Sequence, residues 1–298
     1  MIFKKKIKAV THNGYFHADD VFSAALLLIV LGENISFTRT RNEKEIQDAD
    51  YTFDVGGVYN PSKHRYDHHQ TGGAGKRENG IPYAAFGLFW KQYGEKMCGS
   101  IGVAEKIEKK LVMPIDANDV GVDIVKSIYP EISSYTVNDI VSSFRPSWKE
   151  DDDTMDACFM EAVRWAKTIL SREIKKAKDA EEAQQFVEKA YEEASDKRLI
   201  ILSRKYPWGD TLRKHPEPLF VVQENTIDNT WRAYAVSKDK NTFENRKNFP
   251  ASWAGKKDAE LASITGVPDA RFCHNGLFLA VAKSKEGALK LADIALKS

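Results

Sequence analysis

The sequence predicts an α/β protein of two domains, and three observations lead to this fold class. Short runs of β-branched and apolar residues alternate with helical patterns in the first part of the chain, which is typical of a parallel sheet. The length of 298 residues exceeds one ordinary hydrophobic core. Beyond residue 195 the pattern changes to short strands. We therefore expect one α/β domain over 1–195 and a smaller α/β domain over 196–298.

The first predicted elements are a strand, a loop and a helix. Ile7–Thr11 is a β-branched and apolar run that ends at His12. The helix is expected over Val21–Leu31, an almost wholly apolar run of eleven residues that Asp19 or Asp20 can cap. This run is too short to cross a membrane, so we expect a buried helix.

The alternation continues along the first domain. It predicts strands at Ile35–Thr40 and Tyr51–Val55 and helices at Lys44–Ala49, Tyr83–Tyr93 and Val103–Leu111. Residues 60–80 lack a sustained period and are rich in Gly, Lys and His, so they predict a long loop of the kind that often carries function.

A long helical pattern precedes the second domain. Residues 151–197 contain apolar residues at helical spacing and no Gly or Pro, which predicts one or two long helices; their part up to residue 195 is assigned to the first domain. The strands predicted after it are Leu199–Leu202, Leu219–Val222, Trp231–Val236, Arg271–Cys273 and Leu277–Ala282.

The composition is that of an ordinary globular protein. Hydrophobic residues make up 42% and charged residues 29%, and the formal net charge of +1 gives no global field that would attract polyanions. The three cysteines are widely separated and form no C-x-x-C motif, which argues against a disulfide framework or a thiolate zinc site. These features predict a cytoplasmic protein without a membrane partner.

Histidines gather near the start of the chain. Five of the seven lie between residues 12 and 69, together with Asp19, Asp54 and the triplet Asp67-His68-His69. Imidazole mixed with carboxylate suits Mn, Co, Fe or Zn better than the oxygen-only sites of Mg or Ca. The sequence therefore predicts a metal site.

The spacing of these residues favours two metals and phosphoester chemistry. Two cations about 3.5–4 Å apart can bind both the attacking water and the phosphoryl oxygens of a phosphoester. His12 and Asp54 each follow a predicted strand, where ligands of parallel sheets gather, and Asp54 precedes two glycines, which places it well to bridge both metals. The candidate ligands are His12, His17, Asp19, Asp54, His68 and Asp116.

This ordered set resembles the DHH phosphoesterase superfamily and, more closely, the melanocyte-proliferating-gene family. The segments that carry the resemblance are Thr11–Asp19, Asp54–Tyr59, His64–Gln70 and Asp116–Gly121. Further agreement at Pro146–Trp148, Pro207-Trp208, Arg246–Trp253 and Phe272–His274 extends it over nearly the whole chain. It implies a DHH-phosphoesterase-like first domain and an activity like that of the eukaryotic members, which are metal-dependent 3′–5′ RNA exonucleases.

The resemblance also implies roles for single residues. Asp54, His68 and His69 would be the catalytic residues, with His69 turned towards the substrate phosphate. Asp67 would support the neighbouring imidazole.

The chain departs from the superfamily pattern in places. His17 and Asp19 fall where the superfamily has two aspartates, with one extra residue in the spacing and an imidazole in place of the first carboxylate. One metal site should therefore be less anionic than usual. The loop after Gln70 is shorter than in animal proteins of the family, and Asp119 could replace or supplement Asp116 as the last ligand.

In the second domain the resemblance suggests substrate contacts. Arg246 suits bidentate binding of phosphate, Trp253 could stack on a base, and His274 is a third candidate. The alternatives are that Trp253 belongs to the core, that Arg246 is an exposed ion-pair partner, and that His274 starts a hairpin turn with Asn275-Gly276.

We predict a metal-dependent phosphodiesterase that removes nucleotides from the 3′ end of RNA or short oligonucleotides, with its catalytic centre between the domains. Two Mn²⁺ ions are the expected cofactors, with Mg²⁺, Co²⁺ or Zn²⁺ as alternatives, and a metal-bound hydroxide is the expected nucleophile. One alternative is a small-molecule phosphoesterase that acts on pyrophosphate, a nucleotide bisphosphate or a cyclic dinucleotide. Another is a non-catalytic interaction protein stabilised by metal. The oligomeric state, including a homo-oligomer, is left open.

Overall fold

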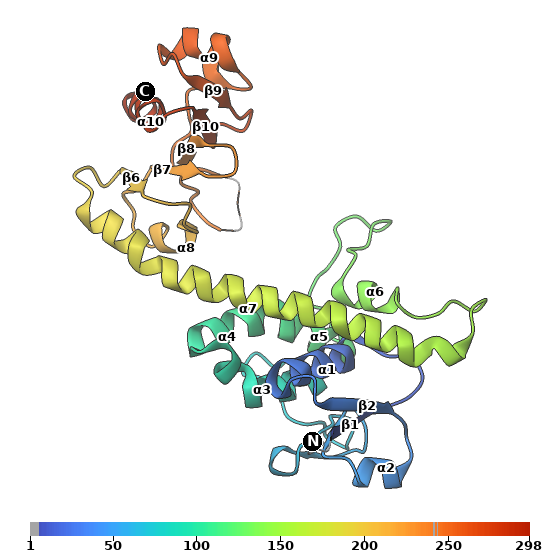
Figure 1. The fold of residues 1–298 in the computed structure, drawn as a ribbon. Helices are drawn as coiled ribbons and strands as arrows, with labels where there is room; N and C mark the ends of the chain where they lie inside the picture. Colours follow the sequence, from blue (N-terminus) through green and yellow to red (C-terminus); the bar gives the residue numbers. More distant parts are fainter. Residues whose placement is uncertain (1–5, 241, 243) are drawn as a thin grey trace, which may run out of the picture. The chain divides into compact units, whose positions relative to one another are not determined.

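The chain forms two compact units, each with its own sheet and hydrophobic core. The computed structural model describes residues 6–240, 242 and 244–298. The units are Met1–Lys178 and Asp179–Ser298, and they divide inside the single long helix α7 (Met155–Glu193) (Figure 1). The domain boundary predicted from the sequence falls instead just beyond the end of this helix.

The first unit is built on a mostly parallel sheet, as the sequence predicts. Its strand order is β2-β1-β3-β5-β4, and only the edge strand β4 runs antiparallel to its neighbour. The strands are β1 (Ile7–Thr11), β2 (Ile35–Arg39), β3 (Tyr51–Phe53), β4 (Tyr59–Asn60) and β5 (Arg65–Tyr66). Residues 60–80, predicted as a long loop, contain only the two-residue strand β5 and a 3₁₀ turn as named elements that lie wholly within them.

Helices cover both faces of this sheet. In Figure 1, α1 and α3 lie on one side of it and α2 on the other. The helices are α1 (Ala18–Leu31), α2 (Glu43–Gln47), α3 (Ala85–Cys98), α4 (Ile101–Ile107), α5 (Met113–Asp119), α6 (Val137–Ser142) and the first half of α7. A π-helical turn, Glu108–Val112, joins α4 to α5, so the acidic segment that follows it is helical.

Helix α1 begins three residues before the predicted start. The Asp20 carboxylate accepts a hydrogen bond from the His17 backbone N–H at 2.9 Å, which caps the helix and places Asp19 in its first turn. The helix is buried from Ala18 to Leu28 because it is apolar on almost every side. This buried position fixes Asp19 firmly at the edge of the core.

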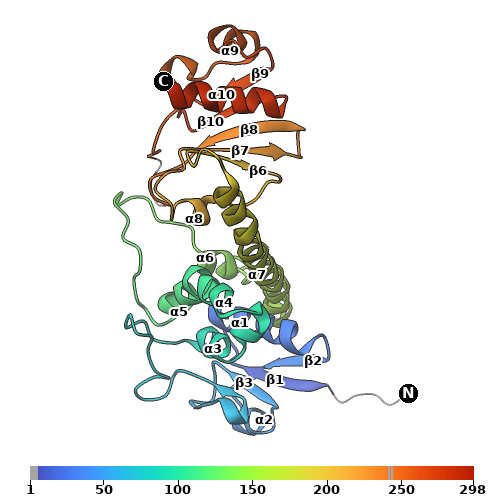
Figure 2. The same ribbon diagram turned by 90° about the vertical axis from the view of Figure 1, so that its left-hand side faces the viewer.

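The second unit has a mostly antiparallel sheet of order β6-β7-β8-β10-β9, in which only β6 and β7 run parallel (Figure 2). Its strands are β6 (Leu199–Leu202), β7 (Phe220–Asn225), β8 (Thr230–Ala235), β9 (Ala270–Cys273) and β10 (Leu279–Ala282). Helix α10 (Lys285–Lys297) packs on β7, β8 and β10, while α8 (Gly209–Leu212) and the end of α7 contribute to a second apolar cluster. Helix α9 (Asp258–Thr265) packs against β9.

Three short 3₁₀ turns complete the secondary structure of the described residues: Pro61–Lys63, Asp152–Thr154 and Ala251–Trp253. Within the same part of the chain, no helix has both the length and the apolar character that crossing a membrane requires.

Candidate metal centre

Three neighbouring parallel strands end immediately before candidate ligands. His12 follows β1, Asp54 follows β3 and Asp67 follows β5. Since β3 pairs with β1 on one side and with β5 on the other, these residues leave the sheet at the same edge. The sheet topology therefore gathers residues that are up to 55 positions apart in the sequence.

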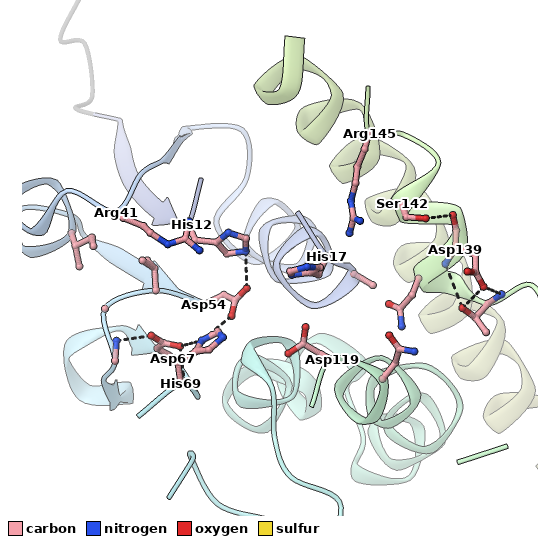
Figure 3. A pocket seen from close by; sticks show the side chains of 18 of the residues that line it. His12, His17, Arg41, Asp54, Asp67, His69, Asp119, Asp139, Ser142 and Arg145 are labelled. Atoms are coloured by element: carbon pink, nitrogen blue, oxygen red, sulfur yellow. Dashed lines mark hydrogen bonds and ion pairs between the residues drawn. The ribbon is translucent and has the colours of Figure 1, made fainter. Parts of the chain in front are cut away.

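Asp54 lies at the centre of this group (Figure 3). Its backbone has a φ of +53°, a left-handed conformation that Asp adopts more readily than most residues. Its Oδ2 lies 3.1 Å from His12 Nε2, whereas its Oδ1 lies 3.4 Å from His69 Nδ1 and 3.6 Å from His68 Nδ1. The two oxygens of one carboxylate thus face different histidines.

Asp67 orients His69. Its carboxylate accepts hydrogen bonds from the backbone N–H groups of Gly57 at 2.5 Å and His68 at 2.7 Å, and it contacts His69 Nδ1 at 2.8 Å. Burial opposes ionisation of Asp67, but the bonds from His69 and Gly57 outweigh it and lower the pKa of this carboxyl to about 2. The same contact with Asp67 raises the pKa of His69 to about 9. His69, whose side chain is 61% exposed, is thus a cation at neutral pH.

His17, Asp19 and Asp119 form the opposite side of the group. Asp19 is fully buried, and burial together with the nearby carboxylate of Asp54 raises its pKa well above the ordinary value. Asp119 Oδ2 lies 3.0 Å from His68 Nε2; burial opposes its ionisation, but the contact with His68 outweighs burial and lowers the pKa of Asp119. Burial lowers the pKa of His17. A neutral imidazole and an ionised carboxylate are the protonation states that metal binding requires.

These residues form overlapping sets that fit metal ions. Within each set the ligand atoms lie within 4.8 Å of one another. Asp54 and His17 each belong to two sets, so the sets are adjacent. The sets are Asp54, Asp67, His68 and His69; His12, His17 and Asp54; and His17, Asp19 and Asp119.

Several buried polar atoms of the group have no hydrogen-bond partner among the residues that the structure describes. They are both carboxylate oxygens of Asp19, Oδ1 of Asp54 and Nδ1 of His68. A buried carboxylate without a partner is strongly unfavourable, and native proteins pair such groups or use them to coordinate metals. The donor set of imidazole and carboxylate, with unsatisfied atoms turned inward, therefore fits divalent cations.

Asp116, predicted as the last ligand, has other partners. Its Oδ2 lies 2.6 Å from Arg77 Nη2, and its Oδ1 accepts a hydrogen bond from the Gly87 backbone N–H at 3.0 Å. Asp116 is absent from all three sets, and Asp119, one helical turn further along α5, is present in one. Of the two aspartates that the sequence left open as the last ligand, the geometry favours Asp119.

Asp20 was predicted to cap α1 and does so, yet it also borders the metal centre. Its Oδ2 lies 3.4 Å from His12 Nε2 and has no hydrogen-bond partner in the described structure. His64, the remaining histidine of the cluster in the sequence, stacks on Tyr51 with ring centroids 4.2 Å apart. It therefore supports the β3–β5 region and lies outside the three sets.

The substrate-binding residues predicted in the second domain have structural contacts. Trp253 is 2% exposed and packs on Phe249 in the core of the unit. Arg246 donates hydrogen bonds to the backbone carbonyls of His215, Pro218 and Arg213. These contacts support the core alternative for Trp253 and give Arg246 a loop-holding role that the sequence analysis did not consider.

His274 also matches its alternative. Its Nδ1 accepts a hydrogen bond from the Gly276 backbone N–H at 2.9 Å, which closes the turn before β10. We therefore carry none of these three residues into the functional proposal.

A pocket of about 970 Å³ opens beside the metal-binding groups. His12, His17, Asp54, His69 and Asp119 line it (Figure 3). Its wall also contains residues that sequence reasoning missed. Asn118 lies within the recognised segment Asp116–Gly121 but was not named as a site residue. The others come from segments without a recognised motif: Arg41, Glu43, Thr136, Asn138, Asp139, Ser142 and Arg145. Arg145 stands directly before Pro146–Trp148, one of the segments that carries the family resemblance.

Comparison with known proteins finds relatives that are named as MYG1 proteins or MYG1 exonucleases. A MYG1 protein of Caenorhabditis elegans is 27% identical over 96% of this chain and 94% of its own length. A MYG1 protein of Dictyostelium discoideum is 30% identical over 95% and 94%, and the human MYG1 exonuclease is 27% identical over 96% and 85%.

A crystal structure of an exopolyphosphatase-related protein from Bacteroides fragilis aligns over 98% of this chain and 92% of that chain, with 12% identity and a TM-score of 0.23. That likeness is too weak to inform the function. The model of the MYG1 exonuclease family, described as an uncharacterised protein family (UPF0160), matches residues 8–296. The family that the motifs resemble is thus confirmed, and this chain belongs to the MYG1 exonuclease family.

Proposed function

We propose that this protein is a metal-dependent phosphodiesterase that acts as a 3′–5′ exonuclease on RNA or short oligonucleotides. The position of Asp54 carries the proposal, because its two oxygens face separate histidines at the wall of a large pocket. A carboxylate in that position suits a bridge between two cations. The relatives named MYG1 exonuclease support nuclease activity, and the cytoplasm remains the compartment that we expect.

We assign the ligands to two divalent cations. His12, His17 and Asp54 would hold one of them. Asp19 and Asp119, which share a set with His17, would hold the other together with His68, which lies 3.0 Å from Asp119 and 3.6 Å from the shared Asp54. The imidazoles argue against Mg²⁺ and Ca²⁺, and the carboxylates suit Mn²⁺. Mn²⁺ is therefore our first choice of metal, with Co²⁺ and Zn²⁺ next.

Divalent cations at these positions would supply Lewis-acid activation of water and of the phosphoryl oxygens. The protein adds a fixed positive charge through His69. Since Asp67 engages His69 Nδ1, the Nε2–H of the imidazolium is left to donate to a phosphoryl oxygen. Asp67 therefore acts as a positioning residue that keeps His69 both charged and oriented.

A small-molecule phosphoesterase is the second candidate function. A pocket of about 970 Å³ lies at the upper end of the range common for small-ligand sites. The same metal ligands would serve pyrophosphate or a cyclic dinucleotide. A purely structural metal site accounts less well for the exposed, charged His69 at the pocket wall.

The test compares the wild-type protein with Asp54→Asn. Both are incubated with Mn²⁺ and a panel of labelled RNA, DNA, dinucleotides and pyrophosphate, and calorimetry measures their Mn²⁺ affinity. We expect RNA to be shortened from its 3′ end. Asp54→Asn should lose at least about 100-fold in kcat/KM, because replacing a residue that only supports a metal ligand already lowers metal affinity or activity 10–100-fold.

Asp50→Asn is the matched control. Asp50 lies four residues away and accepts a hydrogen bond from the Lys8 backbone N–H at 2.8 Å, outside the pocket wall. Full turnover by Asp54→Asn would contradict the bridging role. Turnover of pyrophosphate or dinucleotides alone would replace the exonuclease with the second candidate function.

A further inference from the structure

Three arginines hold the short loop that joins His12 to helix α1. Arg39 donates a hydrogen bond to the Gly14 carbonyl, and Arg41 donates to the Asn13 carbonyl at 2.5 Å and to its side-chain oxygen at 2.8 Å. Arg145 donates to the Phe16 carbonyl through Nε at 2.8 Å and also through Nη2. All three side chains thus contribute to the shape of the loop that carries His12 and His17.

Arg39 differs from the other two in its charge partner and location. It pairs with the Asp156 carboxylate at 2.9 Å, and its side chain is only 3% exposed. It borders a separate pocket, together with Asn13 and Tyr15. The charge of Arg39 is therefore neutralised by Asp156, and its role is structural.

Arg41 and Arg145 keep their charge and line the metal-centre pocket. Within the described residues their hydrogen bonds end on carbonyl or amide oxygens, and no ion pair there includes them, although the charge of the Asp20 carboxylate acts on Arg145. Hydrogen bonds to neutral oxygens orient a guanidinium without cancelling its charge. The ring of Tyr15, 5.5 Å from the Arg145 guanidinium carbon, adds a second restraint.

Both guanidinium groups retain donors for another ligand. A guanidinium carries five N–H donors, and the loop contacts occupy Nε and Nη2 of Arg145 but only Nη1 of Arg41. The groups with remaining donors include Nη1 of Arg145 and Nε and Nη2 of Arg41. Such planar forks match the geometry of phosphate oxygens.

The two arginines reach the pocket from different segments. Arg41 lies between β2 and α2, and Arg145 follows α6. Figure 3 shows His12 and His17 between them, with Arg145 directed towards His17. The guanidinium groups of Arg41 and Arg145 thus place positive charge beside His12 and His17. His69 is a third cation of the pocket wall, separate from these two.

We propose that Arg41 and Arg145 bind two further phosphates of the substrate, both on the 5′ side of the phosphate at the metal centre, because the 3′-terminal nucleotide that is released carries no further phosphate. The substrate class that follows is a chain of nucleotides rather than a single phosphoester. This inference rests on the function proposed above and makes its substrate more specific.

The experiment uses the full-length protein and the variants Arg41→Ala, Arg145→Ala, Arg41→Lys and Arg145→Lys. The substrates are a labelled five-nucleotide RNA and bis(p-nitrophenyl) phosphate, which offers only one phosphate. We expect each alanine variant to raise KM for the RNA by about 10-fold or more, as for a lost charge-assisted hydrogen bond, and KM for the small ester by a clearly smaller factor.

Binding provides a readout that is independent of turnover. The salt dependence of RNA affinity is measured by fluorescence anisotropy with Ca²⁺ in place of Mn²⁺. Each alanine variant should reduce the slope of log K against log salt by about 0.7, the value for one phosphate contact on a single strand, while each lysine variant keeps the wild-type slope. Unchanged slopes in the alanine variants would overturn the inference.

Arg39→Gln is the matched control, because it removes a contact to the same loop outside the metal-centre pocket. It should keep the wild-type salt slope, and circular dichroism shows whether it folds. Calorimetry should give Arg41→Ala and Arg145→Ala the Mn²⁺ affinity of the wild type. A parallel loss of Mn²⁺ affinity in these two variants would mean that the arginines only shape the loop, and would also overturn the inference.

The design separates the two proposals. If the wild-type protein hydrolyses neither substrate with any divalent metal, the proposed phosphodiesterase function fails. If the wild-type protein hydrolyses both, and the alanine variants raise KM by the same factor for both substrates, the phosphodiesterase function stands. The inference about further phosphates then fails.

Discussion

Asp116 and Asp119 are three residues apart in one helix, and their surroundings differ completely. Asp116 is fully buried against α3, where it contacts Arg77 and the backbone of Gly87. A side chain at Gly87 would meet Asp116 Oδ2 at 1.8 Å, so the glycine creates the space that this carboxylate fills. Asp119 instead borders the pocket and contacts His68.

This contrast predicts that similar substitutions at the two positions change different properties, stability at Asp116 and metal affinity at Asp119. Asp116→Ala should lower the free energy of unfolding by on the order of 3 kcal/mol, because it leaves Arg77 buried with only Glu108 as a charged partner. The variant should keep its Mn²⁺ affinity. Asp119→Ala should lose at least about 10-fold in Mn²⁺ affinity.

Urea unfolding of the metal-free proteins and Mn²⁺ calorimetry measure the two effects separately. A loss of metal affinity in Asp116→Ala, with Asp119→Ala unaffected, would return the ligand role to Asp116.

The sequence could not decide between these two aspartates. Three residues in an α-helix correspond to a rotation of about 300°, so the two side chains point only about 60° apart. Which of them meets the pocket depends on how α5 rotates against α3, and that is set by packing of residues distant in sequence. The same limit applies to Trp253, because a sequence pattern does not distinguish a buried indole from an exposed platform for a base.

At the scale of elements, the ends of strands were the most predictable feature. β-branched and apolar runs predicted β1 and β3 closely enough to place His12 and Asp54 at one edge of a parallel sheet. The short strand β5 was missed because its two residues, Arg65 and Tyr66, carry no period. The pocket wall contributed by α6 and Arg145 was missed for a similar reason, since it follows a long segment without regular structure.

The hairpin of β7 and β8 gives a prediction at this scale. Asp228 in its turn accepts hydrogen bonds from Thr230 and Asn225 side chains, both at 2.6 Å, and pairs with Arg232 at 2.8 Å. The bond from Thr230 is the largest cause of the lowered pKa of Asp228. A lowered pKa in the folded state stabilises the protein above the ordinary carboxyl pKa of about 3.9, and this contribution is lost as pH falls through the folded value.

We therefore expect Asp228→Asn to be less stable than the wild type at pH 7, and the difference to shrink as the pH falls below about 4. Urea unfolding at pH 7, 5, 4 and 3 measures this trend. Asp293→Asn is the control, because Asp293 forms an exposed i,i+4 pair with Lys297 that should contribute little. A difference that grows towards low pH would refute the assigned sign.

For the whole molecule, all proposed metal ligands belong to the first unit. The first and last of them are His12 and Asp119, and that unit extends to Lys178. A ligand that binds only the folded state stabilises it by about 2.7 kcal/mol at 100 times its dissociation constant. The second unit has a separate core and no share in the three metal-binding sets.

Scanning calorimetry with increasing Mn²⁺ should therefore raise the transition of the first unit and leave that of the second in place. The shift should be absent in Asp54→Asn. The variants described above identify the two transitions, because Asp116→Ala should lower the transition temperature of the first unit and Asp228→Asn that of the second. An equal shift of both transitions would show that the metal stabilises more than the first unit.

The order of the ligands along the chain also matters during synthesis. Because the full set is contained in residues 12–119, a growing polypeptide possesses every metal donor while the second sheet is still untranslated. Domains generally fold as units from the N-terminus as they emerge from the ribosome. Cations captured at that time would stabilise the nascent first unit, so metal supply in the cell would influence the yield of folded protein as well as its activity.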